Sequence, residues 1–130
     1  MDGKTYCAMN LTPSEHDEQV TLFAWAELAS VQYPQLKLLF AIPNGGARHP
    51  VVGAKLKKEG VKAGVPDLFL PVARGDSHGL FIELKTANGR PTPIQREWLL
   101  SLHCQGYKTV VAYGWDEARS CIEAYLQRKA

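Results

Sequence analysis

Two neighbouring apolar stretches with acidic residues at their ends constrain the fold of this chain more than any other feature. From Ala63 to Lys85 the sequence reads A-G-V-P-D-L-F-L-P-V, a short polar turn, and then G-L-F-I-E-L-K. Short runs of this kind, bounded by glycine, proline and polar residues, are typical of β-strands. We therefore expect two strands, at about 67–72 and 79–85, joined by a loop.

The charged residues of these two strands are expected to gather in one place. Successive side chains of a strand point to opposite faces, so Glu83 and Lys85 share one face and Ile82 the other. Asp67 opens the neighbouring strand. An unpaired carboxylate beside an apolar core is costly, and a divalent cation would relieve that cost. Asp67 and Glu83 offer the hard oxygen ligands that Mg²⁺ prefers, and Lys85 would lie beside the ion and hold or polarise an attacking water.

The order and spacing of these residues resemble a known nuclease signature. V-P-D followed at 16 residues by E-L-K resembles the PD-(D/E)XK motif. The wider context I-P-N-G-G-A-R, K-x-x-G-V-K-A-G-V-P-D, F-I-E-L-K and G-R-P-T-P-I-Q is similar to the VRR-NUC branch of that superfamily, in its stand-alone phage or bacterial type. The resemblance covers about Glu15 to the C-terminus. The alternative is that Asp67 caps a turn and that Glu83 and Lys85 form an exposed pair on an edge strand.

The resemblance implies a set of site residues. By this resemblance, Asp67, Glu83 and the carbonyl of Leu84 would hold Mg²⁺ or Mn²⁺, and a glutamate from the first helix would assist. We carry that last role to Glu18, which lies on a stripe with apolar residues of this helix, although Glu15 competes for it. A solvated helix acid is the plain alternative for Glu18.

Two helix starts share one sequence pattern. Thr12 is expected as an N-cap with Pro13 at the first helical position and Glu15 at the third, and this helix should run to about Ser30. The segment T-P-I-Q repeats the pattern and places Gln95 at the third helical position. The family has a glutamine at this point, where it could orient water or a phosphate. Capping alone would explain Gln95 equally well.

A basic cluster precedes the first acid of the motif. The glycine loop allows close approach of another chain, and the lysines that follow could contact phosphates. The alternative is a solvated helix face, which is what most lysine runs are. His49 lies beside a proline and is a weak metal-ligand candidate. The residues expected to bind DNA are Asn44, Gly45, Gly46, Arg48, Lys55, Lys58 and Lys62.

The remaining periodicity completes an α/β fold. We expect a strand at about 37–42, a short helix from Pro50 to Gly60, a strand at 108–113 and a last helix after Gly114. The element order α-β-α-β-β-α-β-α predicts a mixed central sheet flanked by helices, in a restriction-endonuclease-like core. Residues 1–11 read as a loose lead-in, and 12–130 as a single nuclease domain.

Composition narrows the class of protein. The net charge of +2 predicts no global attraction to a polyanion, so DNA binding must come from local clusters. The sequence has no apolar run long enough to span a membrane and no signal peptide, so we expect no membrane association. It also has no phosphate-binding G-x-x-x-x-G-K-[ST] loop, so we expect no nucleotide cofactor. Three scattered cysteines fit the reducing cytoplasm of a bacterial or phage-infected cell.

These observations lead to one functional expectation and one alternative. The expected function is a Mg²⁺- or Mn²⁺-dependent DNA endonuclease. The resemblance implies a structure-specific enzyme, similar to Holliday-junction resolvases of DNA repair or recombination, that acts as a homodimer on branched DNA. The alternative is a catalytically silent DNA-binding module on the same scaffold.

Overall fold

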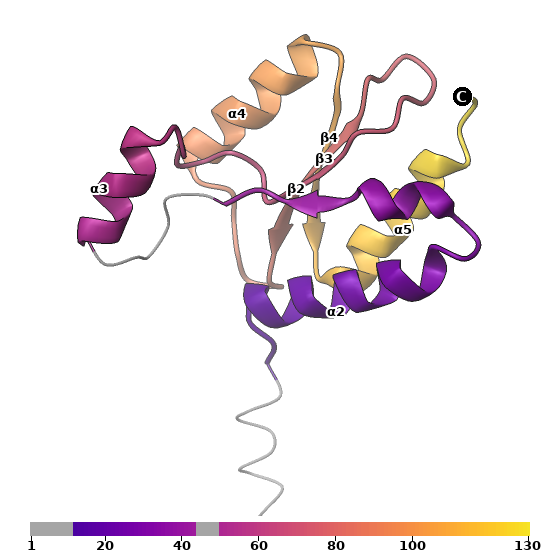
Figure 1. Cartoon of the computed structure of the whole chain (residues 1–130), viewed down its shortest axis with the longest axis horizontal. Coiled ribbons are helices and arrows are strands. Elements are labelled where there is room, and N and C mark those ends of the chain that lie inside the picture. The colour runs from indigo at the N-terminus through magenta and orange to yellow at the C-terminus, as the bar shows by residue number, and fades with distance from the viewer. Residues whose placement is uncertain (1–11, 44–49) are drawn as a thin grey trace, which may run out of the picture.

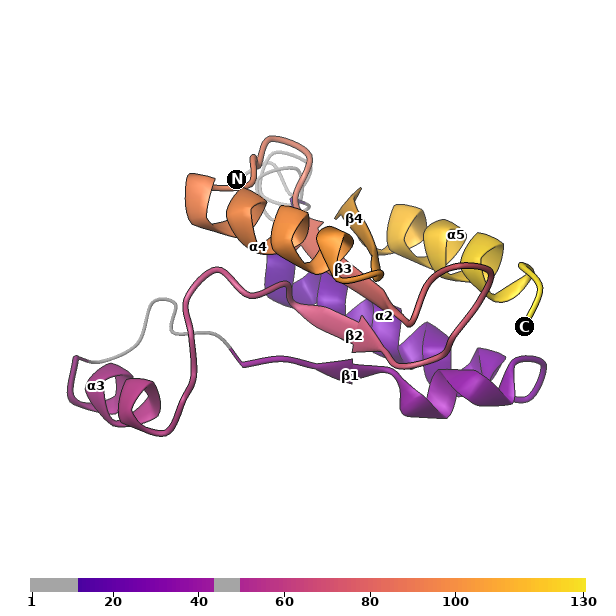
Figure 2. The same cartoon turned by 90° about the horizontal axis from the view of Figure 1, so that it is seen from above.

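The protein forms a four-stranded mixed sheet with helices on both sides (Figures 1 and 2). The computed structural model describes residues 12–43 and 50–130. The element order confirms the expected order, with one added 3-10 helix. The elements are α2 (Glu15–Ala29), the 3-10 helix η1 (Pro34–Leu38), β1 (Phe40–Ala41), α3 (Pro50–Lys58), β2 (Leu68–Leu70), β3 (Leu80–Lys85), α4 (Pro93–Cys104), β4 (Lys108–Tyr113) and α5 (Trp115–Leu126).

The strands follow one another across the sheet in the order β1-β2-β3-β4. The pairs β1–β2 and β2–β3 are antiparallel, whereas β3 and β4 are parallel, with Leu80 opposite Lys108 and Lys85 opposite Tyr113. A parallel neighbour needs a long connection, and α4 provides it. The mixed sheet flanked by helices is therefore confirmed. Within the described segments, no helix has the length and apolarity needed to cross a bilayer.

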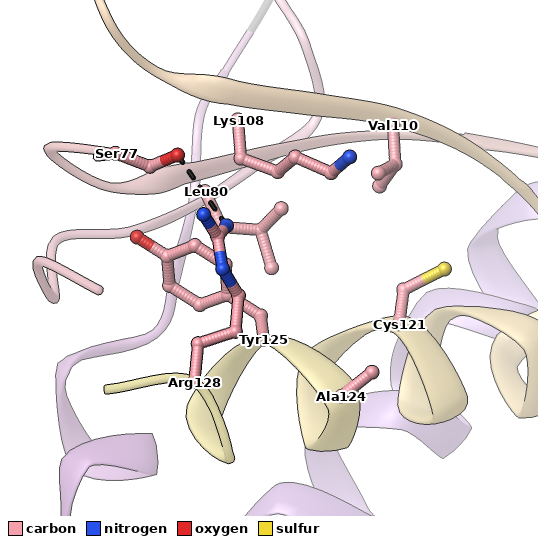
Figure 3. Close-up of a pocket in the computed structure, with 8 residues that line it drawn as sticks. All are labelled: Ser77, Leu80, Lys108, Val110, Cys121, Ala124, Tyr125 and Arg128. Carbon is pink, nitrogen blue, oxygen red and sulfur yellow. Dashed lines mark hydrogen bonds between the residues drawn. The ribbon is translucent and has the colours of Figure 1, made fainter. Parts of the chain in front are cut away.

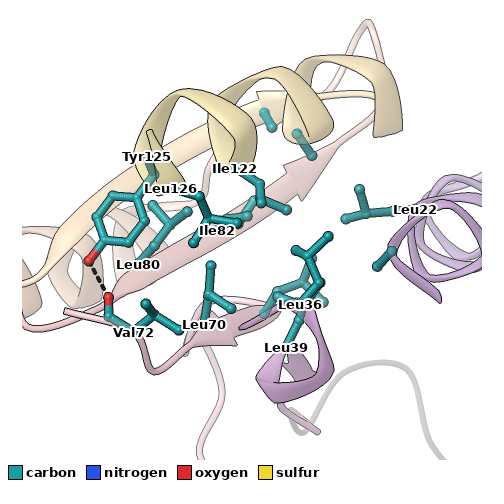
Figure 4. Packing of buried hydrophobic residues seen from close by; sticks show 14 of the residues in the cluster. Leu22, Leu36, Leu39, Leu70, Val72, Leu80, Ile82, Ile122, Tyr125 and Leu126 are labelled. Carbon is teal, nitrogen blue, oxygen red and sulfur yellow. Dashed lines mark hydrogen bonds between the residues drawn. The ribbon is translucent and has the colours of Figure 1, made fainter. Parts of the chain in front are cut away.

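The main core lies between the sheet and the helices α2 and α5 (Figure 4). Leu22 of α2 and Ile122 of α5 are fully buried against Leu68, Leu70 and Ile82 of the central strands. At the far end of this core the Tyr125 hydroxyl donates a 2.6 Å hydrogen bond to the Val72 carbonyl, which fixes the C-terminal turn of α5 to the chain after β2. This core holds the two central strands in a defined register.

The opposite face of the sheet carries an aromatic group and then the acids. The rings of Phe69 and Phe81 stack with centroids 4.2 Å apart, and Tyr107 meets both edge-on. Asp67 comes two residues before Phe69, and Glu83 comes two residues after Phe81. Because side chains alternate along a strand, these acids belong to the aromatic face and not to the core between α2 and α5.

The first helix starts two residues later than predicted. Its N-cap is Ser14 and not Thr12: the Ser14 hydroxyl accepts from the Asp17 N–H at 3.1 Å, and the Asp17 carboxylate accepts from the Ser14 N–H at 3.1 Å. T-P-S-E and S-E-H-D both fit a capping box, and the second one forms. Glu15 is therefore the first residue of the helix and is released from the capping role that the sequence assigned to it.

The predicted strand at 37–42 was also wrong over most of its length. Pro34 begins a 3-10 helix, and the chain is extended only at Phe40–Ala41. The buried residues here are Leu36 and Leu39, whereas Leu38 is 52% exposed. The burial period is thus three residues, as a 3-10 helix requires, although the leucines also alternate as in a strand. The strand expected at 67–72 is likewise shorter, because Pro71 has no N–H to donate to a ladder.

The turn before β2 depends on a glycine, and this gives a stability prediction. Gly64 has a φ of +89°, and a Cβ at this position would come within 2.9 Å of the Ile94 side chain on α4. We expect Gly64→Ala to lower the free energy of unfolding by about 1–3 kcal/mol. Gly53→Ala on α3 is the matched control, because a Cβ there meets nothing within 4 Å. It should be neutral or stabilising by up to about 1 kcal/mol. Equal effects of the two substitutions in urea denaturation would contradict this account of the turn.

Candidate active site

The two acids of the motif lie opposite each other at the end of the β2–β3 ladder. Leu68 is paired with Ile82, and continuing this antiparallel register by one residue places Asp67 opposite Glu83 on the same face. The Asp67 carboxylate also accepts a 2.7 Å hydrogen bond from the Leu84 N–H. Like charges directly opposite each other destabilise a sheet, so this pair is unfavourable unless its charge is offset.

Glu83 is the most unusual residue of the protein. It is 1% exposed, and neither of its carboxylate oxygens has a hydrogen-bond partner among the described residues. Burial, and after it the charge of Asp67, raises the pKa of the Glu83 carboxyl from 4.5 to about 8, against the smaller opposing effect of Lys85. A carboxyl that is buried, unpartnered and beside a second carboxyl is poised to accept a cation.

Lys85 extends this group towards the first helix. Its side chain is 8% exposed, and its Nζ lies 3.5 Å from Glu83 Oε2 and 3.9 Å from Glu15 Oε2. Glu15 is on the first turn of α2, where its carboxylate is about half exposed. One ammonium thus bridges a buried carboxyl on β3 and a solvent-facing carboxylate on α2. The structure brings Asp67, Glu83 and Lys85 together as the sequence analysis expected.

Glu18 lies elsewhere. Its Oε1 accepts a long 3.5 Å contact from the Trp115 N–H at the start of α5, and Gly114, the N-cap of α5, offers no side chain for this purpose. A carboxylate near a helix N-terminus offsets the positive end of the helix dipole. The structure therefore places Glu15 beside Lys85, and Glu18 at the helix start of α5. The sequence analysis gave the first-helix role to Glu18 because Glu15 was expected to belong to a capping box with Thr12, whereas Ser14 and Asp17 form the box.

The Leu84 carbonyl has no backbone donor opposite it, because the facing residue is Pro66. Continuing the register by two residues places Pro66 opposite Leu84, and proline has no N–H to donate. The N–H and carbonyl of one strand residue point to the same edge, so this carbonyl faces the side from which Asp67 approaches. Pro66 thus ends the ladder and gives the Leu84 carbonyl no donor, while the Leu84 N–H donates to the Asp67 side chain. The sequence analysis did not assign this role to Pro66, although a proline before an acid was visible.

Gln95 has the structural role that the sequence allowed for it. Thr92 is the N-cap of α4: the Gln95 Oε1 accepts from the Thr92 N–H at 2.8 Å, and the Thr92 hydroxyl accepts from the Gln95 N–H at 3.3 Å. The expected capping box is confirmed. The amide oxygen of Gln95 accepts the hydrogen bond of the cap, and a role for Gln95 in catalysis stays a prediction.

The basic cluster is described only in part. Asn44, Gly45, Gly46, Arg48 and His49 lie outside the described residues. Lys55 and Lys58 are exposed on α3, which stands apart from the sheet and its flanking helices (Figure 2). Lys62 follows this helix. Lys62 lines a cavity of about 570 Å³ together with Ile94 and Trp98 of α4. The segment between α3 and β2 therefore runs along the start of α4.

The group fits a divalent cation. Its donors are two carboxylates from adjacent strands and one backbone carbonyl, all of them the hard oxygen ligands of Mg²⁺ or Mn²⁺. The two unpartnered oxygens of Glu83 are the observation that carries this fit. Among the residues that the structure describes, no three acidic, histidine or cysteine side chains converge, so Glu18 does not join the pair. Water and a substrate phosphate would have to complete the coordination shell.

Comparison with known proteins agrees with this geometry. The model of the VRR-NUC domain matches residues 14–116, which is most of the chain. The chain belongs to the VRR-NUC domain family. A solved structure described as a VRR_NUC domain protein is 34% identical, with a TM-score of 0.76, and the match covers 90% of this chain and 91% of that one. No curated protein matches the chain. The restriction-endonuclease-like fold is consistent with this neighbour, and membership of the VRR-NUC family implies a nuclease-type activity.

The pKa of Glu83 gives a pH-dependent prediction for the VRR-NUC protein in a chelating buffer. The folded protein keeps the Glu83 proton up to about pH 8, whereas the unfolded chain releases it near 4.5. The native state therefore binds more protons in this range, and stability should fall as the pH rises through it. Glu83→Gln should reduce this loss by at least about 1.4 kcal/mol, which corresponds to one pKa unit. Urea denaturation at about pH 5 and pH 8 measures it. The same pH dependence in both proteins would contradict the burial of an unpartnered carboxyl.

Proposed function

We propose that this protein is a divalent-metal-dependent DNA endonuclease that hydrolyses phosphodiester bonds. One observation carries the proposal: the buried carboxyl of Glu83, which accepts no hydrogen bond among the described residues, lies opposite Asp67 and 3.5 Å from the Lys85 ammonium. A protein that only bound DNA would have no use for two acids at this place, since they repel phosphate unless a cation lies between.

Asp67, Glu83 and the Leu84 carbonyl would hold Mg²⁺ or Mn²⁺. When bound, the ion polarises the scissile phosphate and makes a water nucleophilic at neutral pH. The two carboxylates fix where the ion lies, because one is tied to the Leu84 N–H at 2.7 Å and the other is enclosed by the sheet. Burial of Glu83 excludes bulk water from one side of the site, which strengthens every charge interaction within it.

Lys85 supplies the positive charge of the protein itself. Its ammonium can donate hydrogen bonds to the attacking water and to a phosphate oxygen that gains negative charge in the transition state. Glu83 and Glu15 hold the ammonium from two sides, at 3.5 Å and 3.9 Å. We therefore assign the first-helix acid to Glu15, as a positioning residue for Lys85, in place of Glu18. Gln95 remains a candidate for contact with the substrate through its amide N–H groups.

The basic residues of the region around α3 supply DNA contact in this proposal. Lys55 and Lys58 are exposed on α3, and the chain continues through Lys62 into the turn that precedes Asp67. Lysines bind phosphates as point charges without reading bases, so they favour affinity over sequence specificity. Asn44, Gly45, Gly46 and Arg48 lie outside the described residues and stay predicted DNA contacts.

Activity on branched DNA by a homodimer extends the proposal. A two-fold dimer would present two sites to two strands, as resolution of a Holliday junction in repair or recombination requires. Exposed apolar side chains in and just after the first helix support association: Val20 and Leu28 of α2 are 55% and 79% exposed, and Val31, two residues beyond its end, is 90% exposed. Large exposed apolar surface is typical of protein contacts.

Cleavage of a four-way junction in the presence of Mn²⁺ tests the proposed activity. Lys85→Ala should lower the cleavage rate by about a hundredfold or more, as expected for loss of a charge that stabilises the transition state. Lys37→Ala, which removes an exposed lysine of η1, is the matched control and should cut at the wild-type rate. A flap and a linear duplex of the same sequence report structure preference. Tight binding without cutting by the wild type, with every metal and substrate, would favour the silent DNA-binding module.

The two glutamates of the first helix give a second test. Glu15→Gln should lower the cleavage rate and leave thermal stability near that of the wild type, because its carboxylate is half exposed. Glu18→Gln should lower stability by about 0.3–1 kcal/mol, as expected for a charge at a helix N-terminus, and leave cleavage almost unchanged. Rates under single-turnover conditions and thermal melts separate the two outcomes. The reverse pattern would return the first-helix role to Glu18.

A further inference from the structure

A second cavity lies far from the proposed nuclease site. It has a volume of about 430 Å³, and its lining includes Leu80 at the start of β3 and Cys121 on α5 (Figure 3). Lys85 ends the same strand, and it points to the opposite face of the sheet from Leu80. The cavity is thus separated from the two acids both along β3 and across the sheet. Its volume is within the range of small-molecule sites.

Arg128 is held in place at this cavity. Its guanidinium lies over the Tyr125 ring, 5.4 Å from the centroid, and its Nη1 donates a 3.4 Å hydrogen bond to the Ser77 hydroxyl (Figure 3). Gly75 makes room for it: a Cβ there would lie 2.6 Å from Nη2. The Tyr125 ring and the loop that carries Gly75 and Ser77 thus restrain one guanidinium, which lowers the entropy lost on binding a ligand.

Lys108, the first residue of β4, lines the same cavity as a second cation (Figure 3). In the part of the chain that the structure describes, neither Lys108 nor Arg128 has a carboxylate at ion-pair distance, whereas Arg119 of α5 pairs with both Asp116 and Glu123. Two cations without counter-charge favour an anion, and a guanidinium favours the oxygen pairs of a phosphate.

The wall of the cavity adds a second requirement. Val110 and Ala124 add partly exposed apolar surface to it, next to the buried side chains of Leu80 and Tyr125. A bare inorganic anion would leave this surface in contact with water. A phosphate ester with a flat apolar body would bury it and still meet both cations.

We propose that this cavity binds a phosphate monoester with an apolar body, of the class of nucleoside monophosphates. The site is independent of the nuclease chemistry proposed above, because it shares no residue with it. Its two essential groups are Arg128, which meets the phosphate in a fixed orientation, and Lys108, which adds charge from the neighbouring strand.

Alkylation of Cys121 measures occupancy of this cavity directly. Burial raises the pKa of the Cys121 thiol, so labelling by iodoacetamide is followed at about pH 8.5 by peptide mass spectrometry. Cys104 is exposed on α4 and is the internal control. A chelator is present throughout, so nuclease turnover plays no part. The probes are deoxyadenosine monophosphate, deoxyadenosine, inorganic phosphate and a 5′-phosphorylated oligonucleotide, and titration calorimetry with the same probes gives their dissociation constants.

The nucleoside monophosphate should slow labelling of Cys121 severalfold and leave Cys104 unchanged, whereas the nucleoside without phosphate should have no effect. Arg128→Gln and Lys108→Gln should each weaken binding about tenfold or more, as expected for loss of a charged hydrogen bond. Lys129→Gln, next to Arg128 but not in the cavity lining, should bind as the wild type does. Protection by the oligonucleotide alone would identify the phosphate as a strand end of DNA. No heat and no protection with any probe, or unchanged binding by both variants, would overturn the proposal.

Discussion

The burial of the Glu83 carboxyl opposite Asp67 is the constraint on which the rest of the site depends. A charged carboxylate removed from water and left without hydrogen bonds costs several kcal/mol, and a second acid beside it adds to that cost. The protein reduces the cost by raising the pKa of Glu83 and by placing the Lys85 ammonium 3.5 Å away. Neither change gives the two Glu83 oxygens a hydrogen bond among the described residues. This residual cost is the physical reason to expect a cation.

The fold holds this unfavourable pair in place. Leucines and isoleucines of β2 and β3 are buried against α2 and α5, so the register that sets Asp67 opposite Glu83 is fixed by the core on the other face. Pro66 ends the ladder one residue before Asp67: it has no N–H to donate, which leaves the Leu84 carbonyl available, while the Leu84 N–H donates to the Asp67 side chain. A stable apolar layer thus positions a polar group that would not assemble by its own interactions.

The sequence predicted the central strands well because short apolar runs bounded by glycine and proline are local signals. β3 and β4 occupy almost the expected residues, and Glu83 and Lys85 share a face as predicted. The first helix start was wrong because two overlapping capping boxes compete, and propensity does not separate Thr12 from Ser14. The contact between Glu15 and Lys85 follows from how α2 packs against β3, which no local pattern contains. The 3-10 helix at Pro34–Leu38 was missed because its leucines also alternate.

We propose above all that the carboxyls of Asp67 and Glu83 share one divalent cation. Titration of the protein with Mn²⁺, followed by calorimetry, tests this most directly when wild type is compared with Asp67→Asn and Glu83→Gln. The asparagine keeps an oxygen that can accept from the Leu84 N–H, so folding should persist, and far-ultraviolet circular dichroism checks it. We predict one Mn²⁺ bound by the wild type and an affinity lower by about tenfold or more in each variant, because each loses a charged ligand. Unchanged Mn²⁺ affinity in both folded variants would contradict the claim.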